Sequence, residues 1–126
     1  MTTYCSRQLY VDRIVASYLR LPGTPLYASR RDRRLAKTLY DRGVPLHVVW
    51  AAFVIAAVRW AIRGPQQRKL EKIRTLYYFL PAIDEVLDIS PEPEYIQYLA
   101  ARLQPFVAEK ERLLTSADPH RAPQTR

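Results

Sequence analysis

The sequence GVPLHVVWAAFVIAAVRWAIR, residues 43–63, contains the most apolar part of this chain. Residues 48–58 are apolar without interruption, and a helix that is apolar on every side is buried among neighbouring helices. A bilayer-spanning helix needs about 20 apolar residues, so this shorter run predicts a core helix instead of a membrane span. The turn Gly43-Val44-Pro45 suits the end of one helix and the start of the next. We therefore expect a buried helix over residues 46–63, with Trp50 inside the core.

Upstream of this stretch, the sequence predicts two further helices. Residues 6–20 repeat apolar side chains at three- and four-residue spacing, which is typical of an amphipathic helix. Residues 21–25 contain two prolines and a glycine, and they predict a loop. Ser29, with Asp32 three residues later, resembles a capping box, so we expect a second helix to begin there and to end at Gly43.

Downstream, proline and glycine divide the rest of the chain. Residues 66–74 are polar and basic, and they are expected to form either a loop or a short exposed helix. A fourth helix is predicted over residues 76–87, with Pro81 either starting it or kinking it. The sequence Ser90-Pro91-Glu92 supplies a cap, a first-turn proline and an acid for a last helix over residues 92–114.

Together these elements predict a single all-α domain over residues 1–114, a compact bundle of about five helices. At its centre, the helices on either side of Gly43 are expected to form a helical hairpin that resembles a helix-turn-helix. Residues 115–126 are polar and contain two prolines, so we expect a disordered tail there.

The charge of the chain is unevenly distributed. It carries 20 Lys and Arg against 12 Asp and Glu, a net charge of +8, and its isoelectric point is near 9.9. Residues 29–74 contain twelve basic and three acidic side chains, whereas residues 82–114 contain three basic and seven acidic ones. Because a basic block attracts polyanions, this separation favours a nucleic-acid-binding protein that grips phosphates.

The basic residues fall into two predicted sets. The first follows Ser29 on the second helix, where an arginine fork can hold two phosphate oxygens, and it consists of Arg30, Arg31, Arg33, Arg34 and Lys37. The second is expected to form a further strip and consists of Arg59, Arg63, Arg68, Lys69, Lys72 and Arg74. The alternatives are a solvated helix face, or an interaction adaptor whose basic face binds an acidic protein. A membrane partner is not expected, because the sequence sets no large apolar residues beside these charges.

Base reading by the hairpin is not expected. In a DNA-binding helix-turn-helix, the first residues of the second helix contact the bases. Here those residues are Leu46, His47, Val49 and Trp50. None is an Arg, Asn or Gln, so an ordinary hairpin is favoured, with phosphates held by the preceding helix. Trp60 and Tyr77 lie nearer to basic residues and stay candidates for stacking on unpaired bases.

The hairpin and an aromatic patch after it carry a family resemblance. The residues are Arg33-Arg34-Leu35-Ala36, Gly43 through Ala52, Tyr77-Tyr78-Phe79 and Ile83. This pattern resembles the helical C-terminal domain of DnaD-like replication proteins, and it is similar to helical modules of plasmid and mobile-element replication initiators. The family's closing segment usually carries a tryptophan, and none follows Trp60 here. The resemblance implies DNA, in preference to RNA, and protein contacts during replication initiation or mobile-element maintenance.

No catalytic, metal or cofactor site is predicted, so the chain is not expected to be an enzyme. His47, His120 and Cys5 do not form a zinc-binding pattern. The acidic side chains between residues 84 and 94 are expected to solubilise helix ends, with acid–base chemistry or cation binding as the alternative. A single cysteine allows no intrachain disulfide and the N-terminus lacks the pattern of a signal peptide, so we expect a cytoplasmic protein.

The last predicted helix favours self-association. Apolar residues at 96, 99, 103, 106 and 113 form a heptad seam with Lys110 in one core position, and Pro105 is expected to bend the helix. The seam fits either an internal helix or a second copy. The acidic side chains of this helix would face the basic strip of another copy, and they are Glu92, Glu94, Glu109 and Glu111. We therefore expect a homodimer, or a contact with another protein, through this helix.

Overall fold

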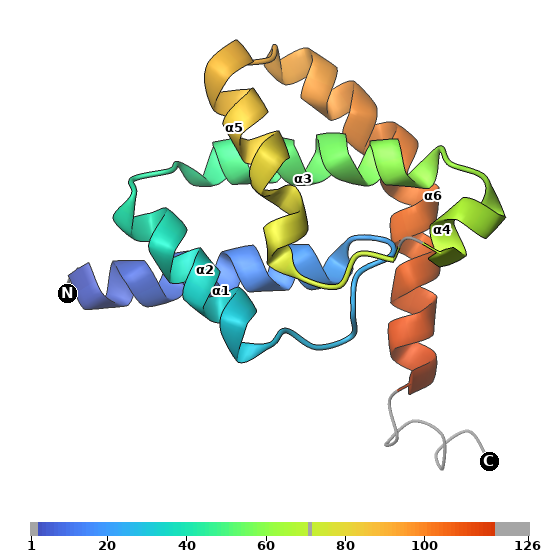
Figure 1. Cartoon of the computed structure of the whole chain (residues 1–126), viewed down its shortest axis with the longest axis horizontal. Coiled ribbons are helices and arrows are strands. Elements are labelled where there is room, and N and C mark those ends of the chain that lie inside the picture. The colour runs from blue at the N-terminus through green and yellow to red at the C-terminus, as the bar shows by residue number, and fades with distance from the viewer. Residues whose placement is uncertain (1–2, 71, 118–126) are drawn as a thin grey trace.

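A computed structural model describes residues 3–70 and 72–117 of the chain. Its elements are α1 (Thr3–Arg20), α2 (Arg30–Asp41), α3 (Leu46–Ala61), α4 (Pro65–Leu70), the 3₁₀ helix η1 (Leu76–Phe79), α5 (Leu80–Ile89) and α6 (Pro93–Ala117). All regular structure in this part of the chain is helical, which confirms the predicted all-α bundle (Figure 1).

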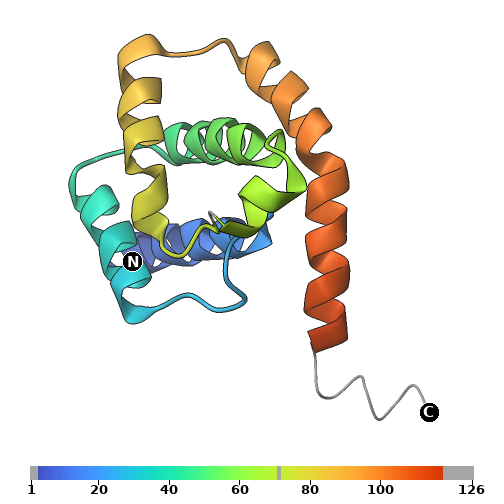
Figure 2. The ribbon, with the colours of Figure 1, turned by 45° about the vertical axis from the view of Figure 1, so that its right-hand side comes forward.

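Helix α3 lies at the centre of the bundle, as its apolar sequence predicts. It packs chiefly against α5 and α6, and more lightly against α1 (Figures 1 and 2). The Phe79 ring of η1 is fully buried and meets the rings of Phe53 and Tyr18 edge-on, with centroids 4.9 and 6.0 Å away. The core therefore joins α1, α3 and η1 through one aromatic cluster.

The expected burial of Trp50 is wrong. Its side chain is 44% exposed, whereas Trp60 near the end of the same helix is only 7% exposed. Trp50 borders two hollows, one lined partly by α1 and the other partly by α6. Because α1 and α6 make few contacts with each other, they leave a strip of α3 uncovered between them.

Helix α2 begins and ends as predicted. Ser29 Oγ accepts a hydrogen bond from the Asp32 amide, and the Asp32 carboxylate accepts one from the Ser29 amide, which completes a capping box. Gly43 follows the helix with a φ of +78°, in the left-handed region that favours glycine. However, α2 packs on α1 and η1 in preference to α3. The two helices of the expected hairpin are therefore adjacent in the sequence, but they are not packed chiefly against each other.

The chain between α3 and α5 is divided more finely than predicted. In residues 66–74, the short-helix alternative holds for the first part, because α4 ends at Leu70. The single helix predicted over residues 76–87 is two elements, η1 and then α5. Pro81 lies in the first turn of α5, so it starts this helix instead of kinking it.

The predicted cap between the last two helices is also shifted. Ser90 caps the C-terminal end of α5 in a left-handed conformation, with a φ of 55°, and its amide donates to the Val86 carbonyl. Pro93, and not Pro91, is the first residue of α6. Prolines occupy positions 91 and 93. Because the chain takes a left-handed turn at Ser90, the new helix begins at the second of them, Pro93.

The heptad seam of α6 faces the interior of the bundle. Ile96, Leu99 and Leu103 are buried, and the helix packs on α3. Of the two alternatives for this seam, the internal one holds for Ile96, Leu99 and Leu103, because α3 covers them. The helix runs through Pro105, and its ribbon changes direction along its length (Figure 2).

The end of α6 lies beyond the predicted boundary of the domain. The helix continues to Ala117, so residues 115–117 are not a disordered tail. The rest of the predicted tail, residues 118–126 with His120, lies outside the described residues. Near the end of the helix, Glu111 pairs with Arg20 of α1 at 2.6 Å, so one of the glutamates proposed for a second copy is used within the chain.

Candidate nucleic-acid interface

Helix α2 carries the first predicted set of basic side chains on its solvent side. All of them are exposed, and we call this set the α2 face: Arg30, Arg31, Arg33, Arg34 and Lys37. The opposite side of the helix is buried and consists of Asp32, Leu35, Ala36 and Leu39. The three- and four-residue spacing that buries one side therefore places the cations together on the other.

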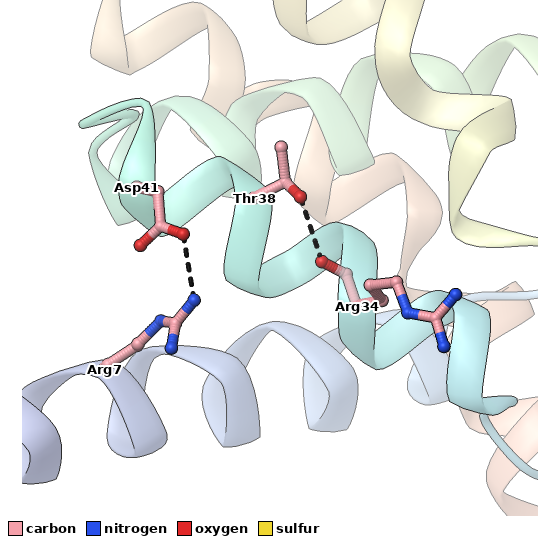
Figure 3. Close-up of polar contacts among 4 residues, drawn as sticks. All are labelled: Arg7, Arg34, Thr38 and Asp41. Carbon is pink, nitrogen blue, oxygen red and sulfur yellow. Dashed lines mark hydrogen bonds and ion pairs between the residues drawn. The ribbon is translucent and has the colours of Figure 1, made fainter.

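Of two carboxylates that form ion pairs around α2, one pairs with a member of the α2 face and the other pairs within the fold. Asp12 of α1 pairs with Arg33 at 3.2 Å. Asp41, at the end of α2, pairs with Arg7 of α1 at 2.8 Å, and the guanidinium of Arg34 extends away from that pair (Figure 3). Among the described residues, no carboxylate lies within ion-pair distance of the remaining members, Arg30, Arg31, Arg34 and Lys37.

The buried carboxylate of Asp32 ties the start of α2 to the segment before η1. Its two oxygens accept hydrogen bonds from the Ser29 amide at 3.0 Å and from the Leu76 amide at 2.9 Å. The second bond places Leu76 beside the first turn of α2, and the exposed Arg74 lies two residues before it. Of the second predicted set, Arg74 thus lies near the start of α2, whereas Lys72 lies beside Gly23.

Two exposed tyrosines flank the first turn of α2. The Arg31 guanidinium carbon lies 5.4 Å from the ring centroid of Tyr77, whose side chain is exposed. Tyr27, two residues before the capping Ser29, is 80% exposed. Tyr77 is one of the two predicted stacking candidates, whereas Tyr27 was missed, and its position in a loop just ahead of an arginine-rich helix is the signal that could have found it.

Arg59, from the second predicted set, belongs to another part of the surface. Its guanidinium donates to both carboxylate oxygens of Glu85 on α5, at 2.9 and 2.8 Å. These bonds hold the pKa of Glu85 below its usual value. The charge of Arg59 is therefore offset within the chain, and the expected continuous strip with Lys72 and Arg74 does not form.

Arg68 is used inside the fold. Its Nη1 donates to the carbonyl oxygens of Ala61 and Arg63 at the C-terminal end of α3. Its guanidinium carbon lies 5.9 Å from the Trp60 ring centroid and 5.7 Å from that of Phe106. Trp60, the other predicted stacking candidate, is thus buried beneath this arginine and not open to a base.

The last two members of the second set are Arg63 and Lys69. Arg63 is half-buried at the end of α3, and the side chain of Lys69 lies outside the described residues. At the other end of α3, His47 and Trp50 are exposed while Val48 and Val49 are buried.

Other classes of site receive no support from the described residues. Residues 3–70 and 72–117 include no group of histidine, cysteine and acidic side chains placed to hold a metal ion. No helix in the same ranges has both the length and the hydrophobicity to cross a membrane. Comparison of the chain with known protein families, curated proteins and solved structures finds no match.

Proposed function

We propose that this protein binds nucleic acid by gripping phosphates with the α2 face. The observation that carries this proposal is the group of exposed cations for which the described residues offer no carboxylate, Arg30, Arg31, Arg34 and Lys37. Such cations release counterions when they contact phosphates, which is the main source of affinity independent of base sequence. The arginine forks add bidentate hydrogen bonds to phosphate oxygens.

The placement of these charges supports a binding role over a structural one. Helix N-termini carry a partial positive charge, so each cation in the first turn costs about 0.3–1 kcal/mol of stability. Arg30, Arg31 and Arg33 all occupy the first turns of α2. Asp32, the one acid there, is buried and uses its oxygens on backbone amides. A surface that lowers folding stability through its own charge is typical of sites that bind an anion.

The proposed mode of binding is phosphate contact with little base readout. The exposed rings of Tyr27 and Tyr77 add stacking platforms for unpaired bases beside the first turn of α2. The resemblance to DnaD-like replication proteins favours DNA over RNA, and favours replication initiation or mobile-element maintenance in the cytoplasm as the setting. In this proposal the chain is a binding protein and not an enzyme.

A triple substitution on α2 tests this function. In the variant Arg30→Ala, Arg34→Ala, Lys37→Ala, affinity is expected to fall for all DNA sequences alike. Log affinity for duplex DNA falls with log salt by about 0.9 for each phosphate contacted, so this slope should also flatten. Fluorescence anisotropy over a salt series measures both quantities.

A matched variant separates position from total charge. Arg20, Arg59 and Arg102 are also exposed, lie off α2, and change the net charge by the same amount when replaced by alanine. This control variant should keep most of the affinity and the slope. Equal losses in the two folded variants would show that net charge alone causes binding, and unchanged affinity in the α2 variant would exclude the proposed face.

A second candidate function, contact with a protein partner, is favoured by an apolar surface at the turn between α5 and α6. Ile62, Ile89 and Tyr95 expose 74%, 63% and 52% of their side chains around a hollow of about 330 Å³. Large contiguous apolar patches on a surface mark sites of protein interaction. Ile89→Asp is expected to abolish any dimer seen by light scattering at micromolar concentration, whereas Leu9→Asp, an exposed leucine on α1, should not. A dimer that persists in Ile89→Asp would place the interface elsewhere.

A further inference from the structure

A hollow in the described residues lies where the 21–29 loop meets the end of α3, α4 and α6. It has a volume of about 440 Å³, within the range of about 300–1,000 Å³ typical of small-molecule sites. Its apolar walls include Leu26, Trp60 and Phe106, and its polar groups include Arg68, Lys72 and Glu109. An apolar pocket with a few polar groups at its edge suits a flat ligand with polar margins.

The wall formed by Arg68 is held rigidly. Two backbone carbonyls at the end of α3 accept hydrogen bonds from its Nη1, and two aromatic rings lie against its guanidinium. A guanidinium plane fixed in this way is one of the surfaces on which nucleic-acid bases stack in proteins. Its rotamer freedom is already lost before any ligand arrives, so binding involves a smaller entropy cost.

The loop wall of the pocket is fixed by Lys110, which itself lines the hollow. Its buried ammonium donates to the carbonyl oxygens of Leu21 and Thr24 at 3.0 and 2.8 Å, and to Thr24 Oγ1 at 2.7 Å. Gly23, with a φ of +83°, lies so close to the Trp60 ring that a Cβ there would come within 2.5 Å of it. Lys110 therefore uses its protons on the loop, and its role is to shape the pocket and not to contact a ligand.

The pocket is continuous with the α2 face. Leu26 at its edge is followed by the exposed Tyr27 and then by the cap of α2. On the other edge, Lys72 leads to Ile73, whose amide donates to the Gly23 carbonyl at 3.1 Å, and on to Arg74 beside α2. The hydrogen bonds of Ile73 and Leu76 therefore connect the pocket to the first turn of α2 across three residues of chain.

We propose that this pocket receives one unpaired base of a nucleic-acid strand whose phosphates lie on the α2 face and on Lys72. The proposal rests on the proposed function and deepens it, because it assigns single-stranded nucleic acid as the preferred partner. The base lies against the Arg68 guanidinium and the Phe106 ring, and the Glu109 carboxylate accepts hydrogen bonds from its N–H groups. Duplex DNA keeps its bases stacked and paired, so it gains only the phosphate contacts.

Two strands with the same phosphates and different bases test the pocket. The probes are an octamer of thymidylate and an abasic octamer, measured by fluorescence anisotropy at one salt concentration. The protein is expected to prefer the thymidylate strand by about tenfold, since base stacking contributes about 1–3 kcal/mol per base. Leu26→Trp fills the mouth of the pocket and should reduce this preference to the part that Tyr27 and Tyr77 contribute, without changing affinity for the abasic strand.

Leu87→Trp is the matched control, because Leu87 is an equally exposed leucine on α5 that lines none of the described hollows. It should keep the preference. Melting curves check folding, and Leu26→Ala, which shortens the wall and should reduce the preference partially, serves if Leu26→Trp unfolds.

The possible results separate the two proposals. A preference that is undiminished in Leu26→Trp would overturn the pocket and assign all of the stacking to Tyr27 and Tyr77. If thymidine monophosphate binds as tightly as the octamer, the pocket is a site for a free nucleotide. The proposal that it receives one base of a strand would then be overturned. A reduced preference with unchanged abasic binding supports the pocket. Failure of the abasic octamer to bind at all would instead overturn the phosphate grip of the α2 face.

Discussion

The α2 face and the region around Lys110 both concentrate cations, but they use them in opposite ways. On α2, Arg30 and Arg34 are exposed and the described residues offer them no carboxylate. Around the 21–25 loop, Lys110 and Arg68 donate to backbone carbonyls and lie among aromatic rings or buried groups. The first cations are available to a partner, whereas the second hold the fold together.

This difference shows that a count of basic residues does not measure a binding surface. A cation is available to a partner only when it has no hydrogen-bond acceptor or carboxylate inside the fold. Removing a cation near Lys110 should therefore lower stability, and removing one from α2 should lower affinity while stability stays the same or rises. The following predictions test that division.

The largest effect is expected at Trp60, which supports both the loop and Arg68. Trp60→Ala should lower the free energy of unfolding by about 3–5 kcal/mol, because it empties a buried space against the Gly23 backbone. Trp50→Ala is the control, since its exposed ring leaves a smaller void and should cost about 1 kcal/mol. Urea unfolding measures both values. Similar costs would mean that the loop does not depend on the Trp60 ring.

Lys110→Met is expected to cost about 3 kcal/mol. Methionine keeps much of the apolar stem, but it leaves the carbonyl oxygen of Thr24 without its donor, and an unsatisfied buried group costs about 1–3 kcal/mol. The Leu21 carbonyl loses one donor and keeps the hydrogen bond from Thr24 Oγ1. If the free energy of unfolding measured in urea is unchanged, the cost of burying the ammonium cancels the stabilisation from its hydrogen bonds.

The cost of Lys110→Met should also depend on pH. Burial lowers the pKa of Lys110 from 10.5 to about 8, so between these values the unfolded chain binds a proton that the folded chain has released. Stability of the wild type should therefore rise with pH in this window relative to the methionine variant. Unfolding at pH 7 and pH 9.5 measures the difference. A cost that shrinks with pH would mean that the surrounding oxygens raise this pKa instead.

Much of the fold follows from local sequence chemistry. The capping box at Ser29 and Asp32 and the left-handed Gly43 form as predicted, because their partners lie within a few residues. The exposure of Trp50 could not be predicted, since it depends on how far apart α1 and α6 lie over α3. The same limit applies to Ser90, where two nearby prolines compete to start one helix.

The candidate site was only partly visible in the sequence. The α2 cations share a face through helical spacing alone, which a sequence shows directly. The division of the second set depends on long-range contacts, such as Arg59 with Glu85 and Arg68 with the end of α3. The hollow beside Leu26 joins segments more than eighty residues apart, so no local pattern could indicate it.

The smallest expected effect, and the sharpest test of the comparison, is a gain in stability on α2. Arg30→Glu replaces a cation at the first position of the helix with an anion, which the positive helix end favours by about 0.3–1 kcal/mol. Lys37→Glu, in the same face but beyond the first turns, is the control and should change stability less. Both variants should bind DNA more weakly, because both lose a phosphate contact. Thermal melting and anisotropy on the same samples give the two quantities. A clear loss of stability in Arg30→Glu would show that Arg30, like Lys110, serves the fold, and the division between the two regions would then fail.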